Sequence, residues 1–220
     1  MGADIFGFKG VDALIFDMDG VLAETIPAHI EAWHDFSRSM GHELTTKEIV
    51  DWMGADNRYY LERIMGRPVT DGEVAFCVER KEGLYRERMR PYLKMPAGLR
   101  SLLDEAKAKG VMLAVATGAP PDNVKFILEG LHLEDDFRIV VDSTQYERCK
   151  PAPDCYLAAA RLLGVEPSGC IVFEDAVGGI RAAKAAGMRV VAIEGTFPRA
   201  TLAAELPDMI GSLTGATAPD

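Results

Sequence analysis

The sequence has little of what marks membrane, secreted and nucleic-acid-binding proteins. No apolar stretch approaches the roughly 18 to 20 residues of a membrane span, although 48% of the 220 residues are hydrophobic. Asp4 and Lys9 interrupt the N-terminal pattern that a secretory leader requires. Basic residues are outnumbered, and the formal net charge of −10 argues against a general nucleic-acid binder, which needs a basic face. We therefore expect neither a membrane nor a nucleic-acid partner.

Cysteine is scarce as well. The four cysteines, at positions 77, 149, 155 and 170, form no Cys-x-x-Cys pair. This usage is typical of reduced thiols and excludes a disulfide framework or a cysteine metal site, so we expect a cytoplasmic protein. A chain of 220 residues holds one large domain or a core with an insert.

Short apolar runs alternate with helical patterns along much of the chain. The strand-like runs are residues 13–16, 111–116, 139–141, 171–173 and 190–193. The helical patterns are residues 99–109, 122–129, 154–163 and 179–186, each followed by a glycine suited to a helix C-terminus. The alternation predicts an α/β fold, a Rossmann-like doubly wound parallel sheet with helices on both faces.

One stretch breaks this alternation. Residues 26–92 contain no β-branched runs and show helical periodicity at 28–40, 46–53, 59–65 and 72–89. We predict that residues 26–92 form a helical cap inserted into an α/β core made of residues 1–25 and 93–220.

The first strand-like run ends in two aspartates, Asp17 and Asp19, followed by Gly20. In an open parallel sheet such strand ends form the edge where sites are built. Gly20 allows a tight turn that could leave main-chain N–H groups facing an anion. An EF-hand loop is excluded because Gly20 is fourth and Val21 fifth in the motif. Considered by itself, the Asp17-Met-Asp19-Gly20 motif could also be a solvated acidic turn with no functional role.

Polar residues also follow the later strand-like runs. Thr117 follows the second run, Lys150 precedes a turn into a helix, and Glu174 with Asp175 ends the fourth. Each of these residues also has a purely structural interpretation. Thr117, and the pair Glu174 and Asp175, could cap helices, and Lys150 could be a solvated surface side chain. Because the ends of parallel strands share one edge, we expect these groups to lie together.

Together the groups suit phosphoryl transfer. Carboxylates and a main-chain carbonyl are the oxygen ligands that Mg²⁺ prefers. The metal and Lys150 would neutralise phosphoryl oxygens, while the Thr117 hydroxyl and backbone N–H groups donate to them. One carboxylate can act as nucleophile, and a second, two residues away, can act as general acid and base.

The motifs make the chain resemble the haloacid dehalogenase superfamily, in its phosphatase and phosphomutase branch. The helical insert is similar to the small cap of the group containing β-phosphoglucomutase and phosphoglycolate phosphatase. The resemblance rests on four motifs in order, Asp17-Met-Asp19-Gly20-Val21-Leu22, Thr117-Gly118, Lys150-Pro151-Ala152-Pro153-Asp154 and Glu174-Asp175-Ala176.

The resemblance implies a role for each matching residue. Asp17 is the implied nucleophile and Asp19 the general acid and base, with Thr117 and Lys150 completing the catalytic set. Mg²⁺ is implied at Asp17, Asp19, Glu174 and Asp175, where Asp19 uses its main-chain oxygen and Glu174 acts through water. The resemblance also implies that Glu24 and Thr25 lie at the hinge of a closing cap.

Substrate recognition is implied for residues in the core and in the insert. These are Gly20, Val21, His29, Gly54, Arg58 and Gly118. The mutase pattern expects a lysine just before Gly54 and an arginine three residues after it, where this chain has Met53 and Asn57. His29 and Trp33 match positions of β-phosphoglucomutase-like sequences. The structural alternatives are a packed helix residue under the cap for His29 and a core residue for Trp33.

The sequence therefore predicts a Mg²⁺-dependent phosphatase acting on a small, sugar-phosphate-like ester through an aspartyl phosphate. The enzyme alternatives are a β-phosphoglucomutase-type phosphomutase and an inorganic pyrophosphatase. A phospho-receiver-like signalling module is the non-enzyme alternative, although a receiver of about 120 residues has no helical insert. The expected partner is a small phosphorylated metabolite, and the expected state is a monomer or weak dimer.

Overall fold

The computed structural model describes residues 10–52, 56–205 and 210–211. The chain divides into two compact units, one of Thr25–Leu93 and one that combines Met1–Glu24 with Lys94–Asp220. The insert predicted at residues 26–92 differs from the first unit by one residue at each end.

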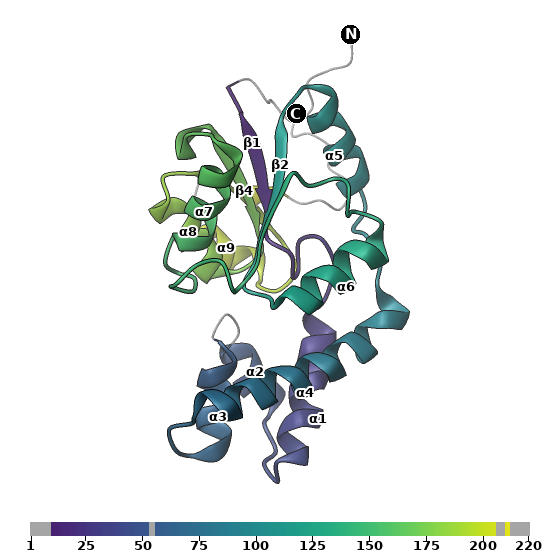
Figure 1. Cartoon of the computed structure of the whole chain (residues 1–220), viewed down its shortest axis with the longest axis vertical. Helices are drawn as coiled ribbons and strands as arrows, with labels where there is room; N and C mark the ends of the chain where they lie inside the picture. Colours follow the sequence, from purple (N-terminus) through teal and green to yellow (C-terminus); the bar gives the residue numbers. More distant parts are fainter. Residues whose placement is uncertain (1–9, 53–55, 206–209, 212–220) are drawn as a thin grey trace. The chain divides into compact units, whose positions relative to one another are not determined.

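The larger unit contains a parallel β-sheet. The described residues give six strands, all parallel, in the order β3-β2-β1-β4-β5-β6, with β1 at the centre beside β2 and β4 (Figure 1). Their bounds are β1 Ala13–Phe16, β2 Met112–Ala116, β3 Ile139–Val141, β4 Cys170–Glu174, β5 Arg189–Ile193 and β6 Ile210–Gly211.

Helices cover both faces of this sheet. In Figure 1, α5 (Leu99–Ala108) and α6 (Pro121–Leu131) lie on one side of it and α7 (Asp154–Leu163), α8 (Val177–Ala185) and α9 (Arg199–Glu205) on the other. A short 3-10 helix, Pro167–Gly169, precedes β4. Because both faces are covered, the central strands are continuous apolar runs, and Ala13, Leu14, Ile15 and Phe16 are fully buried. The predicted doubly wound α/β fold is confirmed.

The strand register fixes which residues meet at the carboxyl edge. Phe16 at the end of β1 pairs with Val115 of β2 and with Phe173 of β4. Asp17, directly after β1, and Glu174, the last residue of β4, therefore lie side by side. The fold alone brings the acidic residues to the edge where open α/β sheets bind ligands.

One helix end differs from the sequence prediction. Gly130 was expected to end a helix over residues 122–129, but α6 continues through it to Leu131. The left-handed residue is His132, with φ of 56°, and its N–H bonds the Glu129 carbonyl. Glycine is tolerated inside a helix at a modest cost, so here it does not act as the stop signal.

The smaller unit consists of helices joined by turns and loops and has no strand among its described residues. Its helices are α1 Ile26–Ser39, α2 Thr46–Asp51, α3 Asn57–Met65, α4 Asp71–Met89 and the 3-10 helix Arg90–Tyr92. Thr45 and Thr70 form capping boxes with Glu48 and Glu73 at the starts of α2 and α4. A buried core includes Trp33, stacked on Tyr60 with ring centroids 4.0 Å apart. Among the described residues, no helix is long and apolar enough to cross a membrane.

Candidate active site

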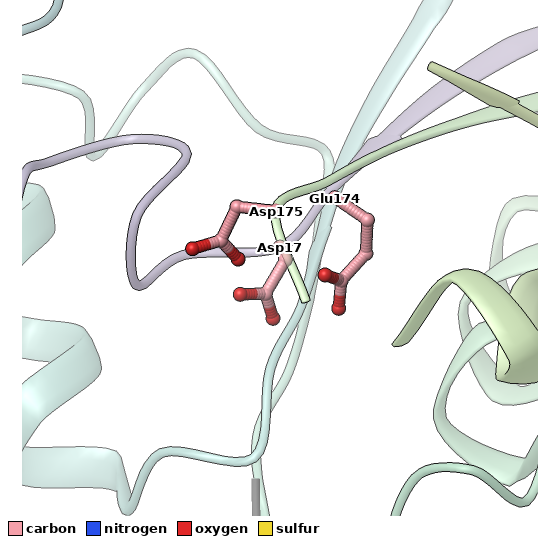
Figure 2. Close-up of side chains that lie close together, drawn as sticks. All are labelled: Asp17, Glu174 and Asp175. Atoms are coloured by element: carbon pink, nitrogen blue, oxygen red, sulfur yellow. The ribbon is translucent and has the colours of Figure 1, made fainter. Parts of the chain in front are cut away.

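Three carboxylates converge where β1 and β4 end. Asp17 follows β1, Glu174 is the last residue of β4, and Asp175 comes next. One carboxylate oxygen from each lies within 4.8 Å of the others, and Figure 2 shows the three groups extending to the same side of the strand ends. Their exposed fractions are 7%, 1% and 2%. Three buried acids this close require positive charge nearby.

Two glycines make room for these carboxylates. A Cβ on Gly179, in the first turn of α8, would lie 1.6 Å from the Glu174 Oε1 atom. A Cβ on Gly20 would lie 1.9 Å from the Asp175 Oδ2 atom, and the φ of Gly20 is +79°. The absence of a side chain at each position therefore lets a carboxylate pack directly against the backbone.

Lys150 provides positive charge to the cluster. Its Nζ donates to Asp17 Oδ1 at 2.6 Å and to Glu174 Oε1 at 2.7 Å. The same nitrogen lies 4.8 Å from the centroid of the Tyr156 ring. Lys150 comes from the segment before α7, so the sequence prediction that it meets the strand ends agrees with this geometry.

The buried acids strongly affect one another's protonation. Burial raises the pKa of Asp17 to about 7, against the opposing effect of Lys150, and Glu174 and Asp19 add to the rise. Burial alone would lower the pKa of Lys150, but Asp17 and Glu174 overcome it and hold that pKa well above its usual value. The cluster therefore favours a further cation, which would stabilise the ionised carboxylates.

The donor set fits a hard divalent cation. Asp17, Glu174 and Asp175 offer oxygen atoms only, and a single lysine cannot neutralise three carboxylates. Mg²⁺ binds oxygen ligands of this kind through a few carboxylates and keeps part of its water. Asp19 is half-buried in the turn after β1 and acts on the pKa of Asp17, which places it beside the cluster.

The turn after Asp17 differs from its prediction in one respect. The sequence predicted that the glycine turn leaves main-chain N–H groups open to an anion. In the structure the Gly20 N–H donates to the Ala23 carbonyl at 2.8 Å, and the Val21 N–H donates to the Met18 carbonyl at 3.3 Å. These two groups close the turn on itself, because a tight reversal uses its own donors and acceptors.

Thr117 and Gly118 directly follow β2, the neighbour of β1. The Thr117 side chain is buried, and its Oγ1 accepts from the Ala119 N–H at 3.1 Å. The Tyr146 hydroxyl donates to the Thr117 carbonyl at 3.2 Å and would lie 3.7 Å from a Cβ on Gly118. The hydroxyl of Thr117 therefore has a defined orientation at the carboxyl edge.

The remaining predicted substrate residues belong to the helical unit. The His29 ring stacks on Tyr85, with centroids 3.9 Å apart, and its Nδ1 lies 2.9 Å from the Nζ of buried Lys81. Arg58 donates to the Val69 carbonyl at 2.7 Å and pairs with Asp71 at 2.5 Å. Gly54 lies outside the described residues.

Substitution of Arg58 tests whether this side chain binds substrate or stabilises the helical unit. Arg58→Ala is expected to lower the free energy of unfolding by about 1 kcal/mol and leave KM unchanged, because its described contacts join α3 to the start of α4. Asp71→Asn, which weakens the same exposed pair, should cost less than about 1 kcal/mol. Urea unfolding and steady-state kinetics check both variants. A rise in KM confined to Arg58→Ala would instead give the guanidinium the substrate contact that the sequence predicts.

Two side chains at the cluster escaped the sequence analysis. The Tyr156 hydroxyl, in the first turn of α7, donates to Glu174 Oε1 at 3.0 Å. The Thr196 hydroxyl, three residues after β5, donates to Asp175 Oδ2. The rule that strand ends share one edge could have found Thr196, since it had been applied only to the earlier strands.

Comparison with known proteins now identifies the family. A family model described as a haloacid dehalogenase-like hydrolase matches residues 11–187. The chain belongs to this family. The match spans most of both units and all four motifs, so the resemblance noted in the sequence is confirmed.

Three relatives illustrate the family's range. The Arabidopsis thaliana protein SUPPRESSOR OF QUENCHING 1 is 35% identical over 91% of this chain, which spans only 19% of that protein. The phosphorylated carbohydrates phosphatase of Thermotoga maritima is 35% identical, over 81% of this chain and 82% of its own length. The β-phosphoglucomutase of Bacillus subtilis is 32% identical, over 82% of both chains.

A solved structure gives the same result. A haloacid dehalogenase hydrolase of family IA, variant 3, from Entamoeba histolytica has a TM-score of 0.85 at 29% identity, covering 91% of this chain and 92% of that one. The protein of the present sequence is therefore an enzyme of the phosphatase and phosphomutase branch, as the sequence predicts. The family match favours this assignment over the phospho-receiver-like signalling module that was the non-enzyme alternative.

Proposed function

We propose that this protein is a Mg²⁺-dependent phosphatase that hydrolyses a small sugar-phosphate-like ester. The observation that carries the proposal is the buried cluster of Asp17, Glu174 and Asp175 with Lys150 between two of its carboxylates. The Thermotoga relative, a phosphorylated carbohydrates phosphatase, supports the substrate class. The four free thiols of the chain support a cytoplasmic location.

The chemistry assigned to the site proceeds in two displacements. An Asp17 carboxylate oxygen attacks phosphorus, the bond from phosphorus to the ester oxygen breaks, and Asp19 gives its proton to the departing alkoxide. Asp19 then takes a proton from water, which attacks the aspartyl phosphate, releases inorganic phosphate and regenerates Asp17. Dividing one difficult displacement into two lowers the barrier of each.

The surrounding groups stabilise the charge that develops on the phosphoryl oxygens. Lys150 donates to Asp17 directly, so its ammonium lies beside the carboxylate that attacks phosphorus. Thr117, at the end of the adjacent strand, offers a hydroxyl for the transferring group. When bound at the three carboxylates, Mg²⁺ would neutralise phosphoryl charge as a Lewis acid.

A β-phosphoglucomutase-type phosphomutase is the second candidate. The Bacillus relative of that name covers most of this chain and supports it. A mutase must hold a sugar bisphosphate by its distal phosphate, for which cationic groups in the helical unit are suited. In this chain Met53 and Asn57 stand where the mutase pattern has a lysine and an arginine, and Arg58 is paired with Asp71. We therefore propose hydrolysis, with water as the phosphoryl acceptor, over the mutase reaction.

A substrate panel tests the proposal. Phosphate release is measured with Mg²⁺ from sugar phosphates, phosphoglycolate, nucleotides and pyrophosphate, with Asp17→Asn as the blank. We expect the largest kcat/KM for a sugar phosphate and none for the blank. Conversion of β-glucose 1-phosphate without phosphate release, in the presence of a bisphosphate primer, would replace the phosphatase by the mutase. Dominant release from pyrophosphate would overturn the substrate class.

A further inference from the structure

Thr196 places a hydroxyl on one of the three clustered carboxylates from an element that carries none of the four sequence motifs. It lies in the segment that follows β5, and its Oγ1 donates to Asp175 Oδ2. Asp175 is 2% exposed, so this hydrogen bond satisfies an oxygen that water hardly reaches. A buried carboxylate oxygen held by such a donor is constrained in orientation.

The fold fixes the position of this hydroxyl. Ile193, at the end of β5, pairs with Gly211 of β6, and the partly buried Phe197 packs against the core cluster to which α7 and α8 contribute residues. Between these anchors, a Cβ on Gly195 would lie 4.0 Å from the Gly20 carbonyl oxygen. The segment is thus held at both ends and passes close to the turn that follows Asp17.

The other side of the Asp175 carboxylate is also confined. A Cβ on Gly20 would lie 1.9 Å from Asp175 Oδ2 and 3.0 Å from Thr196 Oγ1, so the bonded pair fills the space that a side chain would need. With Oδ2 placed between Thr196 and the Gly20 backbone, the carboxylate has little freedom to rotate. Its other oxygen, Oδ1, is then the one left to serve as a ligand.

We propose that Thr196 is a positioning residue that orients Asp175 for Mg²⁺ and thereby sets the affinity of the metal site. The inference rests on the metal site of the proposed function and adds a residue to it. Contacts of this kind orient carboxylate ligands, and their removal typically weakens metal binding by about 10-fold to 100-fold. The effect depends on the hydroxyl and not on the bulk of the side chain.

A purely structural role for Thr196 makes a different prediction. If the hydroxyl only tethered the segment after β5, its loss would lower the stability of the metal-free protein and leave the metal affinity of the folded protein unchanged. Thr196→Val removes the hydroxyl and keeps the shape, whereas Thr196→Ser keeps the hydroxyl and removes a methyl group. The exposed Thr201 of α9 supplies a matched control, Thr201→Val.

The test is direct binding of Mg²⁺ to the full chain by isothermal titration calorimetry, without substrate. We expect Thr196→Val to weaken binding about 10-fold, and Thr196→Ser and Thr201→Val to stay within about twofold of the unsubstituted chain. The unfolding temperature of each metal-free variant, followed by circular dichroism, should stay within a few degrees of the parent.

Three results would overturn the inference in distinguishable ways. An unchanged dissociation constant in Thr196→Val would leave the proposed metal site standing and remove Thr196 from it. Equal weakening in the valine and serine variants would trace the effect to packing and not to the hydroxyl. Failure of the unsubstituted chain to bind Mg²⁺ at millimolar concentration would contradict the metal site itself, and with it the proposed function.

Discussion

Asp17→Asn is expected to reduce phosphate release by at least about a thousandfold, a loss of about 4 kcal/mol in transition-state stabilisation. The amide keeps the volume of the side chain but cannot attack phosphorus to form an acyl phosphate. The fold should persist, because the change removes one of three mutually repelling carboxylates that are buried together. Initial rates on the best substrate of the panel and the midpoint of thermal unfolding measure the two parts of this expectation.

Asp142→Asn is the matched control for this variant. Asp142 also follows a strand, β3, at the same edge of the sheet, but its Oδ1 accepts from the Thr144 N–H at 2.8 Å and from the Thr144 hydroxyl at 2.6 Å. These local contacts give it the role of a turn residue, so its activity should remain near that of the unsubstituted protein. Full activity in Asp17→Asn, or equal loss in both variants, would contradict the assignment of the nucleophile.

Lys150→Met is expected to lower both activity and stability. Its ammonium bonds Asp17 and Glu174, so its removal leaves two buried carboxylates without that partner. Removing one member of a buried ion pair typically costs about 3–5 kcal/mol, and we expect a loss in this range for the metal-free protein. We also expect kcat to fall by about 100-fold or more at saturating Mg²⁺, because a charge that stabilises the transferring phosphoryl group is gone.

Two further variants isolate the electrostatic origin of this loss. Lys125→Met, at a lysine whose side chain is 71% exposed, should change the free energy of unfolding by less than about 0.5 kcal/mol. The double variant Asp17→Asn with Lys150→Met should be more stable than Lys150→Met alone, since it removes one of the carboxylates left unpaired. Additive stability changes in urea unfolding would show that Lys150 acts through packing and not through its charge.

The sequence predicted the core of this fold well because apolar strands and glycine-ended helices leave strong signals. The first strand, residues 13–16, agrees with β1, and the helix at residues 154–163 agrees with α7, which ends at the left-handed Gly164. Gly130 gave a wrong helix end, because a glycine marks a helix end only where the chain needs a left-handed residue, which here is His132. The two-residue strand β6 was too short to give a periodic signal.

The site was predictable to the extent that its residues follow strands. Asp17 and Asp175 directly follow strands and Glu174 ends one, and the three meet in the structure as the parallel topology requires. Tyr156 lies on a helix and its role depends on which side chains face each other across the edge, which no spacing in the chain reveals. Thr196 follows β5, so the same strand-end rule would have included it had it been applied to that strand. The pairing of Arg58 with Asp71 was likewise beyond the sequence, because it depends on how α3 and α4 pack, and the predicted substrate role of Arg58 stays a prediction.

The central claim is that Asp17 carries the phosphoryl group between substrate and water. The direct test mixes the protein with a substrate that bears a ³²P-labelled phosphoryl group, quenches with acid within milliseconds, and digests the protein for mass spectrometry. The account predicts label on the peptide that contains Asp17, stable in acid and released by hydroxylamine as expected of an acyl phosphate, and no label in Asp17→Asn. Turnover with no label at Asp17, or label at another residue, would contradict it.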